Sequence, residues 1–385
     1  MKSRMLGAAW WLVVPLVAHG LSPLRFLPGR RSRPVRVWND ESALPAPGQP
    51  LRVVVWNIQY CAGISQHFFY DGGRAVSTDE ATVRRTAKAI AEVLAKTEAD
   101  VILLQEVDRR ARRTAYVDQF QLLREALKAH GLGCSASASY WRVPYVPRPK
   151  WEHLGRTGMH LATFSRFKIE NATRWQLPLI KSDSWLRRLF NLRRCALDVT
   201  IGDCAFINTH LSAFSKGDGT LESQIHVLET VVRRRRRKQK SWLLAGDFNS
   251  LPPWQDSKNL APEEAALYPE GLSPLMALYS EHNAAFCPPA TDGDTESFTY
   301  KPFTSVEPDR TIDHAFASDD VSFDAVAVLK TGSDFLSDHQ PIQLDVSFLP
   351  EVSSSSGSAA DDENGAPAPV GEDSEDSGRL NFVIS

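Results

Sequence analysis

Residues 241–249 read SWLLAGDFN, a short apolar run followed at once by the polar residues Asp247 and Asn249. A run of this length that ends in a glycine is typical of a buried strand rather than a helix. Other short apolar runs end in the same way: residues 53–56 at Asn57, residues 101–104 at Gln105 and Glu106, and residues 205–207 at Asn208 and His210. The chain therefore predicts several buried strands that deliver polar groups at their carboxyl ends.

Apolar residues at helical spacing lie between these strands. Two segments carry the pattern: Val83, Ala87, Ile90, Ala91 and Leu94 in the first, and Leu221, Ile225, Leu228 and Val232 in the second. Ser77 and Glu80 have the spacing of a capping box, which predicts a helix start just before the first segment. Strands that alternate with helices over residues 51–349 predict an α/β domain.

The polar strand ends form a chemically consistent set of carboxylates, amides and imidazoles. Its members are Asn57, Glu106, His210, Asp247, Asn249, Asp313, Asp338 and His339. Buried charges are costly unless they are paired or bind a metal ion. The simplest account is that these residues converge on one site at one end of a layered α/β domain.

Oxygen ligands of this kind favour a hard divalent cation, Mg²⁺ or alternatively Mn²⁺, over zinc. Glu106 and Asp338 are the carboxylates best suited to bind it. Mg²⁺ usually takes one or two carboxylates and leaves its other positions to water and phosphate oxygens. The residue types therefore indicate a metal-dependent reaction on a phosphate ester.

Phosphodiester hydrolysis also needs an oriented water, donors to the phosphoryl oxygens and help for the leaving group. We expect Asp247 to orient or deprotonate the water, and His210 and Asn249 to donate to phosphoryl oxygens. His339, paired with Asp313, offers an imidazole that binds or protonates phosphate at neutral pH. The remaining members of the set therefore match the needs of this reaction.

The composition excludes several other classes of protein. The chain has 385 residues, of which 43% are hydrophobic, so it is large and apolar enough to form a core. Its five cysteines include no Cys-x-x-Cys pair, which excludes a disulfide scaffold and a zinc ribbon. The formal net charge of −2 gives no overall positive excess for gripping a polyanion.

Both ends of the chain differ in composition from the middle. Residues 5–21 are apolar apart from His19 and are flanked by basic residues, which is typical of a secretory signal or a short membrane anchor. An apolar extension that packs on the domain is the alternative. These features divide the chain into a signal peptide or membrane anchor with a basic flank (1–37), a linker (38–50), a catalytic domain (51–349) and an acidic disordered tail (350–385).

Six short motifs occur in order along the domain: Trp56-Asn57, Gln105-Glu106, Asn208-Thr209-His210-Leu211, Gly246-Asp247-Phe248-Asn249, Ile312-Asp313-His314 and Ser337-Asp338-His339. Together they resemble the endonuclease/exonuclease/phosphatase superfamily, the group with the deoxyribonuclease-I-like fold. The resemblance implies a four-layer α/β sandwich, with two central mixed sheets flanked by helices. It also implies a Mg²⁺-dependent phosphoesterase.

The resemblance assigns roles by position. It implies a metal site at Asn57, Glu106 and Asp338, phosphate contact and water positioning at His210, Asp247 and Asn249, and a catalytic histidine, His339, held by Asp313. His314 stands where many relatives have an aromatic residue, and it either supports the site or is exposed. Tyr140 and Tyr145 are the candidates for the tyrosine that nuclease relatives use on phosphate.

Two substrate classes compete within this interpretation: a phospholipid or sphingomyelin-like diester, and DNA or RNA. The inositol-polyphosphate phosphatase branch normally carries a Trp-x-Gly-Asp-x-Asn-aromatic-Arg pattern. Leu244-Ala245 before Gly246 and Ser250-Leu251 after Asn249 depart from it, which argues against this branch. An inactive binding module on the same fold is a further alternative, against which the intact site residues argue. We expect a monomer that is membrane-associated through its N-terminus, secreted or periplasmic.

Two basic segments carry alternative interpretations. Residues 233–238 are six consecutive basic residues that either bind phosphoinositide or nucleic acid or form a solvated helix end. Residues 184–194 mix tryptophan, leucine and arginine, and either lie on a membrane interface or form a surface loop beside the active site.

Overall fold

The computed structural model describes residues 32–213, 217–238, 240–268, 271–290, 295–330 and 336–349. This part of the chain contains two sheets of seven strands each. The expected signal or anchor at 5–21 and the acidic tail lie outside the described residues. Among the helices that are described, none has both the length and the apolar character needed to cross a bilayer.

The first sheet has the strand order β1-β7-β8-β9-β10-β12-β11. Its strands are β1 (Ser32–Pro34), β7 (Asn171–Gln176), β8 (Cys195–Ile201), β9 (Cys204–His210), β10 (Ser241–Asp247), β11 (Asn283–Ala284) and β12 (Asp313–Ala317). Only β9 and β10 run parallel, and the other neighbours are antiparallel.

The second sheet has the strand order β13-β14-β3-β4-β6-β5-β2. Its strands are β2 (Val37–Trp38), β3 (Leu51–Asn57), β4 (Val101–Asp108), β5 (Cys134–Trp141), β6 (Met159–Ser165), β13 (Val321–Val328) and β14 (Ile342–Phe348). Here β3 and β4 form the parallel pair. Both sheets are therefore mixed, as the resemblance implied.

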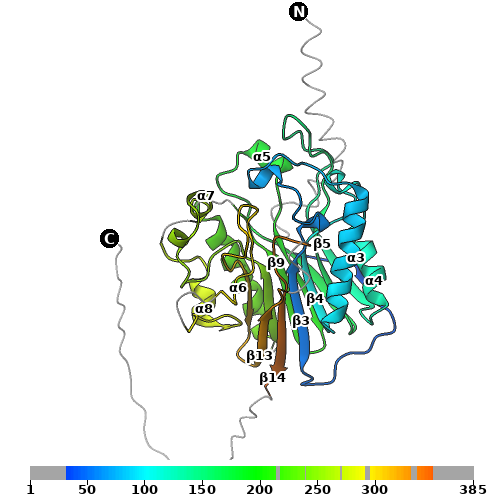
Figure 1. Ribbon diagram of the computed structural model, residues 1–385. Helices are drawn as coiled ribbons and strands as arrows, with labels where there is room; N and C mark the ends of the chain where they lie inside the picture. The colour runs from blue at the N-terminus through cyan, green and yellow to red at the C-terminus, as the bar shows by residue number, and fades with distance from the viewer. Residues whose placement is uncertain are drawn as a thin grey trace, which may run out of the picture. The chain divides into compact units, whose positions relative to one another are not determined.

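Helices cover the outer face of each sheet (Figure 1). Helices α3 (Glu80–Lys96) and α4 (Gln119–Lys128) pack on the second sheet, and α6 (Thr220–Arg236) and α8 (Met276–Glu281) pack on the first. Two short helices, α5 (Trp185–Phe190) and α7 (Pro262–Ala265), lie in connecting segments. A third apolar cluster fills the space between the sheets. The expected four-layer α/β sandwich is confirmed.

The first helix begins two residues later than its capping box predicted. Asp79 is the N-cap of α3, and its carboxylate accepts a hydrogen bond from the Thr82 backbone N–H. Ser77 instead donates its hydroxyl proton to Glu152, 2.9 Å away. Serine and aspartate are both favoured at the N-cap position. Because the Ser77 side chain is engaged with Glu152, Asp79 caps the helix instead.

Two strands precede residue 51, in the segments expected to be a basic flank and a linker. Strand β1 pairs with β7 in the first sheet, and β2 pairs with β5 in the second. The Trp38 ring lies 5.1 Å from the Phe120 ring. These strands are only three and two residues long, so their sequence carries too few positions for a strand pattern to be visible.

Strand register places site residues in rows at one end of each sheet. In the first sheet, Asp247 is opposite His210 on β9 and opposite Asp313 on β12. In the second, Asn57 is opposite Gln105, which Glu106 follows directly. The parallel pairs β9–β10 and β3–β4 therefore bring distant sequence motifs to neighbouring positions.

Asn208 ties the two sheets together beneath this end of the sandwich. It lies on β9 of the first sheet and is fully buried. Its side-chain Nδ2 donates to the carbonyls of Leu104 and Ala162 in the second sheet, at 3.0 Å each, and Gln105 Nε2 donates to its Oδ1 at 2.8 Å. Leu104 and Ala162 are paired beside a bulge in the β4–β6 ladder, so the amide joins the sheets where regular pairing stops.

Gly246 supports a testable prediction about β10. Its φ of 148° is open to glycine alone, and a Cβ built on it would lie 2.0 Å from the Thr209 carbonyl oxygen of β9. We expect Gly246→Ala to lower the free energy of unfolding by about 3 kcal/mol or more, measured by urea denaturation.

Gly72→Ala is the matched control for this substitution. Gly72 also has a positive φ, 88°, but no heavy atom lies within 4 Å of its built Cβ. It should therefore lose only about 1 kcal/mol. Equal losses of stability in the two variants would show that position 246 requires glycine because of its positive φ, and not because a side chain there would clash with β9.

Candidate active site

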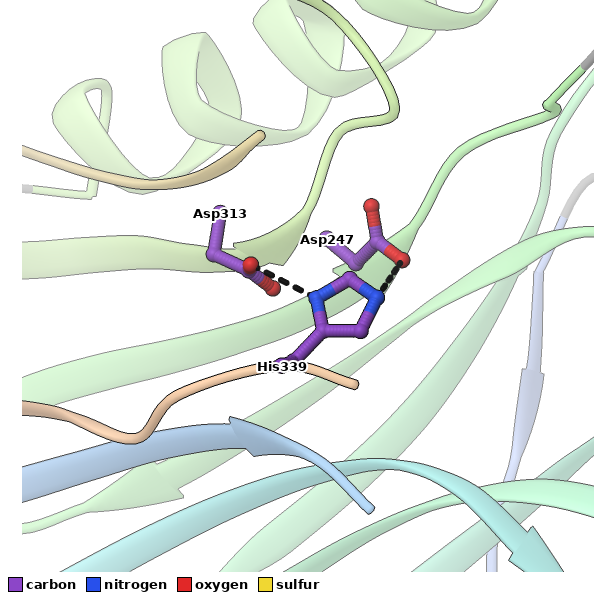
Figure 2. Close-up of side chains that lie close together, drawn as sticks. All are labelled: Asp247, Asp313 and His339. Atoms are coloured by element: carbon purple, nitrogen blue, oxygen red, sulfur yellow. Dashed lines mark hydrogen bonds and ion pairs between the residues drawn. The ribbon is translucent and has the colours of Figure 1, made fainter. Parts of the chain in front are cut away.

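His339 lies between two aspartates at the centre of the site (Figure 2). Its Nδ1 is 2.7 Å from Asp313 Oδ2, and its Nε2 is 3.7 Å from Asp247 Oδ2. Trp56 fixes the backbone, because its indole N–H donates to the His339 carbonyl at 2.8 Å. Burial lowers the pKa of His339, but the carboxylates of Asp313 and Asp247 outweigh it and raise that pKa to about 10. The ring therefore carries a positive charge at neutral pH.

Asp247 is the acceptor at which several donors meet. Asn57 Nδ2 donates to its Oδ2 at 3.0 Å, the Asn249 backbone N–H donates to its Oδ1 at 2.8 Å, and His210 Nε2 lies 3.2 Å from Oδ2. Burial raises the pKa of the Asp247 carboxyl to about 7, and the nearby Asp313 adds to the effect. A carboxyl group with this pKa can accept a proton near neutral pH.

His210 connects Asp247 to Tyr140. Burial, together with the charges of Arg194 and His339, holds the pKa of His210 well below its usual value, so the ring is neutral. The partners assign the tautomer: Nε2–H donates to Asp247, and Nδ1 accepts from the Tyr140 hydroxyl at 3.2 Å. Both ring nitrogens are thus engaged, and His210 holds Asp247 rather than offering a free N–H to phosphate.

Glu106 lies within the bulge in β4 and has a left-handed φ of 60°. Its backbone N–H donates to the Tyr140 hydroxyl at 3.2 Å, and its Oε1 lies 4.0 Å from His210 Nδ1. Burial raises the pKa of the carboxyl group, against the charges of Arg113 and Arg194. Neither carboxylate oxygen accepts a hydrogen bond from another described residue. Left-handed backbone at a non-glycine residue is a strain that functional sites commonly retain.

The Asp338 carboxylate forms no hydrogen bond with His210, Asp247 or His339. It is half-buried, and its Oδ1 accepts a 3.3 Å hydrogen bond from Ser337 Oγ. Burial raises its pKa to about 7. Asp338 lines a cavity of about 250 Å³ beside His339, together with Gln59, Phe68, Asp71, Tyr300 and Lys301. The His67 and Phe303 rings stack 4.2 Å apart at this cavity.

The segment after Asn57 is held in an unusual conformation. Gln59, Tyr60 and Cys61 all have positive φ values, between 41° and 55°. Asn57 Oδ1 accepts from the Gln59 N–H at 3.1 Å, and Gln119 Nε2 donates to the Tyr60 carbonyl at 2.5 Å. Hydrogen bonds from several elements therefore stabilise this turn, which leads from the site into the wall of the cavity.

The site offers two places where a divalent cation could bind, one at Asp247, Asp313 and His339 and the other at Glu106 and Asn57. Among the described residues, Asp247, Asp313 and His339 each offer one ligand atom within 4.8 Å of the others, a group that could hold a metal ion. Glu106 offers free carboxylate lone pairs, and Asn57 Oδ1 accepts only one hydrogen bond. The positive charge on His339 opposes a second cation between the aspartates, so the Glu106 side of the site fits the cation better.

The structure thus joins most of the residues that the sequence singled out. One network of hydrogen bonds and ion pairs contains Asn57, His210, Asp247, Asp313 and His339. Asn249 joins it through its backbone N–H, and Glu106 joins it through Tyr140. The carboxylate of Asp338 bonds only to the hydroxyl of the preceding residue, Ser337. Asn249 Nδ2 donates to the Leu211 carbonyl at 3.2 Å, which leaves one amide hydrogen for a ligand.

The sequence left two aromatic positions open, and the structure separates them. Tyr140 is buried in the network, whereas Tyr145 is 45% exposed and contacts His153.

His314 is buried behind the site: its Nε2–H donates to the Ser250 carbonyl at 2.9 Å, and its Nδ1 accepts from the Tyr279 hydroxyl. Burial lowers its pKa to about 4. The sequence did not single out Thr299, because it belongs to none of the six motifs. Its Oγ1 accepts a hydrogen bond from the Asp313 N–H at 3.2 Å.

Comparison with protein families decides the relationship. A family model described as the Endonuclease/Exonuclease/phosphatase family matches residues 54–339. The chain belongs to this family. The match includes every site residue from Asn57 to His339. Members of the family are generally hydrolytic phosphoesterases. A comparison with curated proteins found no match.

Solved structures of the family share the fold. An endonuclease/exonuclease/phosphatase from Beutenbergia cavernae DSM 12333 is 22% identical with a TM-score of 0.56, over 78% of this chain and 72% of that one. A second, from Bacteroides vulgatus, is 15% identical with a TM-score of 0.50, over 78% of this chain and 99% of that one. At these identities the likeness concerns the fold, and the chemistry must be argued from the site.

Proposed function

We propose that this family hydrolase is a Mg²⁺-dependent phosphodiesterase. The observation that carries the proposal is the position of the His339 ring, which Asp313 holds at 2.7 Å through Nδ1 and which lies 3.7 Å from the Asp247 carboxylate through Nε2. Such a pair, a proton acceptor for water beside a cationic donor for the phosphoryl oxygens, accelerates phosphate ester hydrolysis. The intact network argues against an inactive binding module on the same fold.

Glu106 and Asn57 would hold the Mg²⁺ ion, and Asp338 would act from the cavity side. When bound, the cation would supply positive charge to the phosphoryl oxygens. Glu106 fits this role because its carboxylate is half-buried and accepts no hydrogen bond from the described residues. Mn²⁺ has the same preference for oxygen ligands and could replace Mg²⁺.

Asp247 would perform the central proton transfer. Held by Asn57, His210 and the Asn249 N–H, it orients a water molecule and accepts its proton as the water oxygen bonds to phosphorus. The ester P–O bond on the opposite side breaks, and the leaving oxygen takes a proton from solvent. His339 Nε2–H and the free amide hydrogen of Asn249 donate to phosphoryl oxygens on which negative charge develops.

The experiment is a phosphodiester assay with and without chelator. We expect hydrolysis of bis(p-nitrophenyl) phosphate that EDTA abolishes and that added Mg²⁺ or Mn²⁺ restores. Activity that persists in EDTA would contradict the metal requirement. A panel of plasmid DNA, RNA, sphingomyelin and phosphoinositides then identifies the natural ester, which is either a phospholipid or a nucleic acid.

A further inference from the structure

Charge is distributed unevenly over the folded domain. Three segments, residues 109–118, 142–158 and 177–194, contain 13 basic and 3 acidic residues. The rest of residues 32–349 contains 25 basic and 35 acidic residues. These three segments, which we call the basic rim, therefore carry a formal charge of +10 on a domain that is otherwise strongly acidic.

The three segments of the basic rim lie together at the active-site end. The Arg109 N–H donates to the Gly158 carbonyl at 2.6 Å, and the Arg193 N–H donates to the Tyr140 carbonyl at 2.6 Å. Trp141 joins the third segment, because its indole N–H donates to the Phe190 carbonyl at 2.8 Å. Tyr140 itself bonds to the site residues, so the rim borders the catalytic network.

Much of this charge is free to meet a partner. Arg109, Arg112 and Arg113 form ion pairs within the domain. Seven basic side chains of the rim are exposed and form no ion pair with any described residue. They are Arg110, Arg142, Arg148, Lys150, Arg156, Lys181 and Arg187. A surface with this many unpaired cations attracts polyanions.

Large aromatic side chains are exposed among these cations. Trp185 on α5 is 72% exposed, Trp151 is 60% exposed, and Tyr116 and Tyr145 are about half exposed. Tryptophan and tyrosine beside arginine and lysine are typical of protein surfaces at a membrane–water interface. Bases of a nucleic acid also stack on aromatic rings, so a further observation must decide the partner.

The point at which the chain enters the domain favours a membrane over a nucleic acid as the partner of the basic rim. Ser32 pairs with Trp175, next to the end of β7 from which residues 177–194 continue. The apolar residues 5–21 precede Ser32 by only ten residues, which reach at most about 35 Å when extended. A bilayer that takes up this apolar run would therefore lie within about 35 Å of Ser32, which is close to the strand end from which the third segment of the rim continues.

We propose that the basic rim docks the domain on an anionic lipid bilayer, with the active site facing the membrane surface. The lipid supplies negative charge to the unpaired arginines and lysines, and Trp185 and Trp151 enter the headgroup region. This docking deepens the proposed function, because it places a phospholipid ester within reach of His339 and Asp247. Binding itself requires no turnover.

The test measures co-sedimentation of the full chain with vesicles of phosphatidylcholine alone and with added phosphatidylserine. One variant replaces Arg142, Lys150 and Arg187 by alanine, and the matched control replaces Arg236, Arg237 and Lys238. Each exposed cation near an anionic surface contributes roughly a fivefold factor in affinity. We expect the rim variant to lose about a hundredfold in affinity for phosphatidylserine vesicles, and the control to stay within about twofold.

A second readout addresses the tryptophans. Brominated lipids should quench the fluorescence of the wild-type protein more than that of Trp185→Phe. Equal loss of affinity in both triple variants, or binding that ignores phosphatidylserine, would overturn the proposal. So would a rim variant that keeps vesicle binding but loses binding to duplex DNA, which would identify the rim as a nucleic-acid surface. None of these results depends on the phosphodiester assay, so the two proposals fail separately.

Discussion

Replacing His339 by alanine is expected to lower kcat/KM for a phosphodiester at least about a thousandfold, because the variant loses the cationic donor that faces the phosphoryl oxygens. Asp247→Ala should have an effect of similar size, since it removes the proton acceptor that two side chains and one backbone N–H position. The measurement is steady-state hydrolysis in saturating Mg²⁺, with the unfolding midpoint recorded for each variant.

His130→Ala is the control for these variants, because His130 is an exposed histidine at the end of α4, outside the network. It should keep wild-type activity within about twofold. A His339→Ala or Asp247→Ala protein that is folded and hydrolyses at near wild-type rates would remove these residues from the mechanism. The family membership and the fold would stand, but the assignment of the site would not.

Replacing Arg113 by methionine is expected to cost about 3–5 kcal/mol in the free energy of unfolding. Arg113 and Asp108 form a buried pair, with Nε 2.7 Å from Oδ2, and their side chains are 3% and 1% exposed. The variant leaves the Asp108 charge buried without its main partner. It also removes the guanidinium that lies 3.7 Å above the Tyr60 ring, in the strained turn after Asn57. Urea denaturation measures the loss.

Two further variants make this prediction specific. Arg84→Met breaks an exposed pair with Glu80 on α3, whose side chains are both about half exposed, and should cost at most about 1 kcal/mol. The double variant Asp108→Leu with Arg113→Met removes both charges and should recover part of the lost stability. A single Arg113→Met variant as stable as the wild type would show that the pair contributes nothing to holding the turn.

The sequence predicted the layout of the site because strand ends carry their own pattern. Short apolar runs ending at Asn57, Glu106, His210 and Asp247 became β3, β4, β9 and β10, and strand register placed their ends in rows. Buried strands need apolar side chains along their length, so the polar residues at their ends stand out. The four-layer arrangement rested instead on the family resemblance, which the structure confirmed.

Other features depend on contacts that no local pattern records. Both nitrogens of His210 are engaged because Tyr140, from a different strand, reaches Nδ1. Strands β1 and β2 are visible only once their partners β7 and β5 are in place. The basic rim is spread over three segments, of which only residues 184–194 stood out in the sequence, and the folded chain brings them to one end of the domain. Tertiary structure, rather than local propensity, decides all three.

The account's central claim is that strand ends from both sheets meet in one active site, in which Glu106 of the second sheet binds a Mg²⁺ ion next to the His339–Asp313 pair. An anomalous difference map from crystals soaked in Mn²⁺ tests this claim most directly. We predict a peak bound to a Glu106 carboxylate oxygen, at about 2.0–2.3 Å, which disappears in Glu106→Gln crystals. A peak held only by Asp247, Asp313 and His339, or no peak within reach of Glu106, would contradict it.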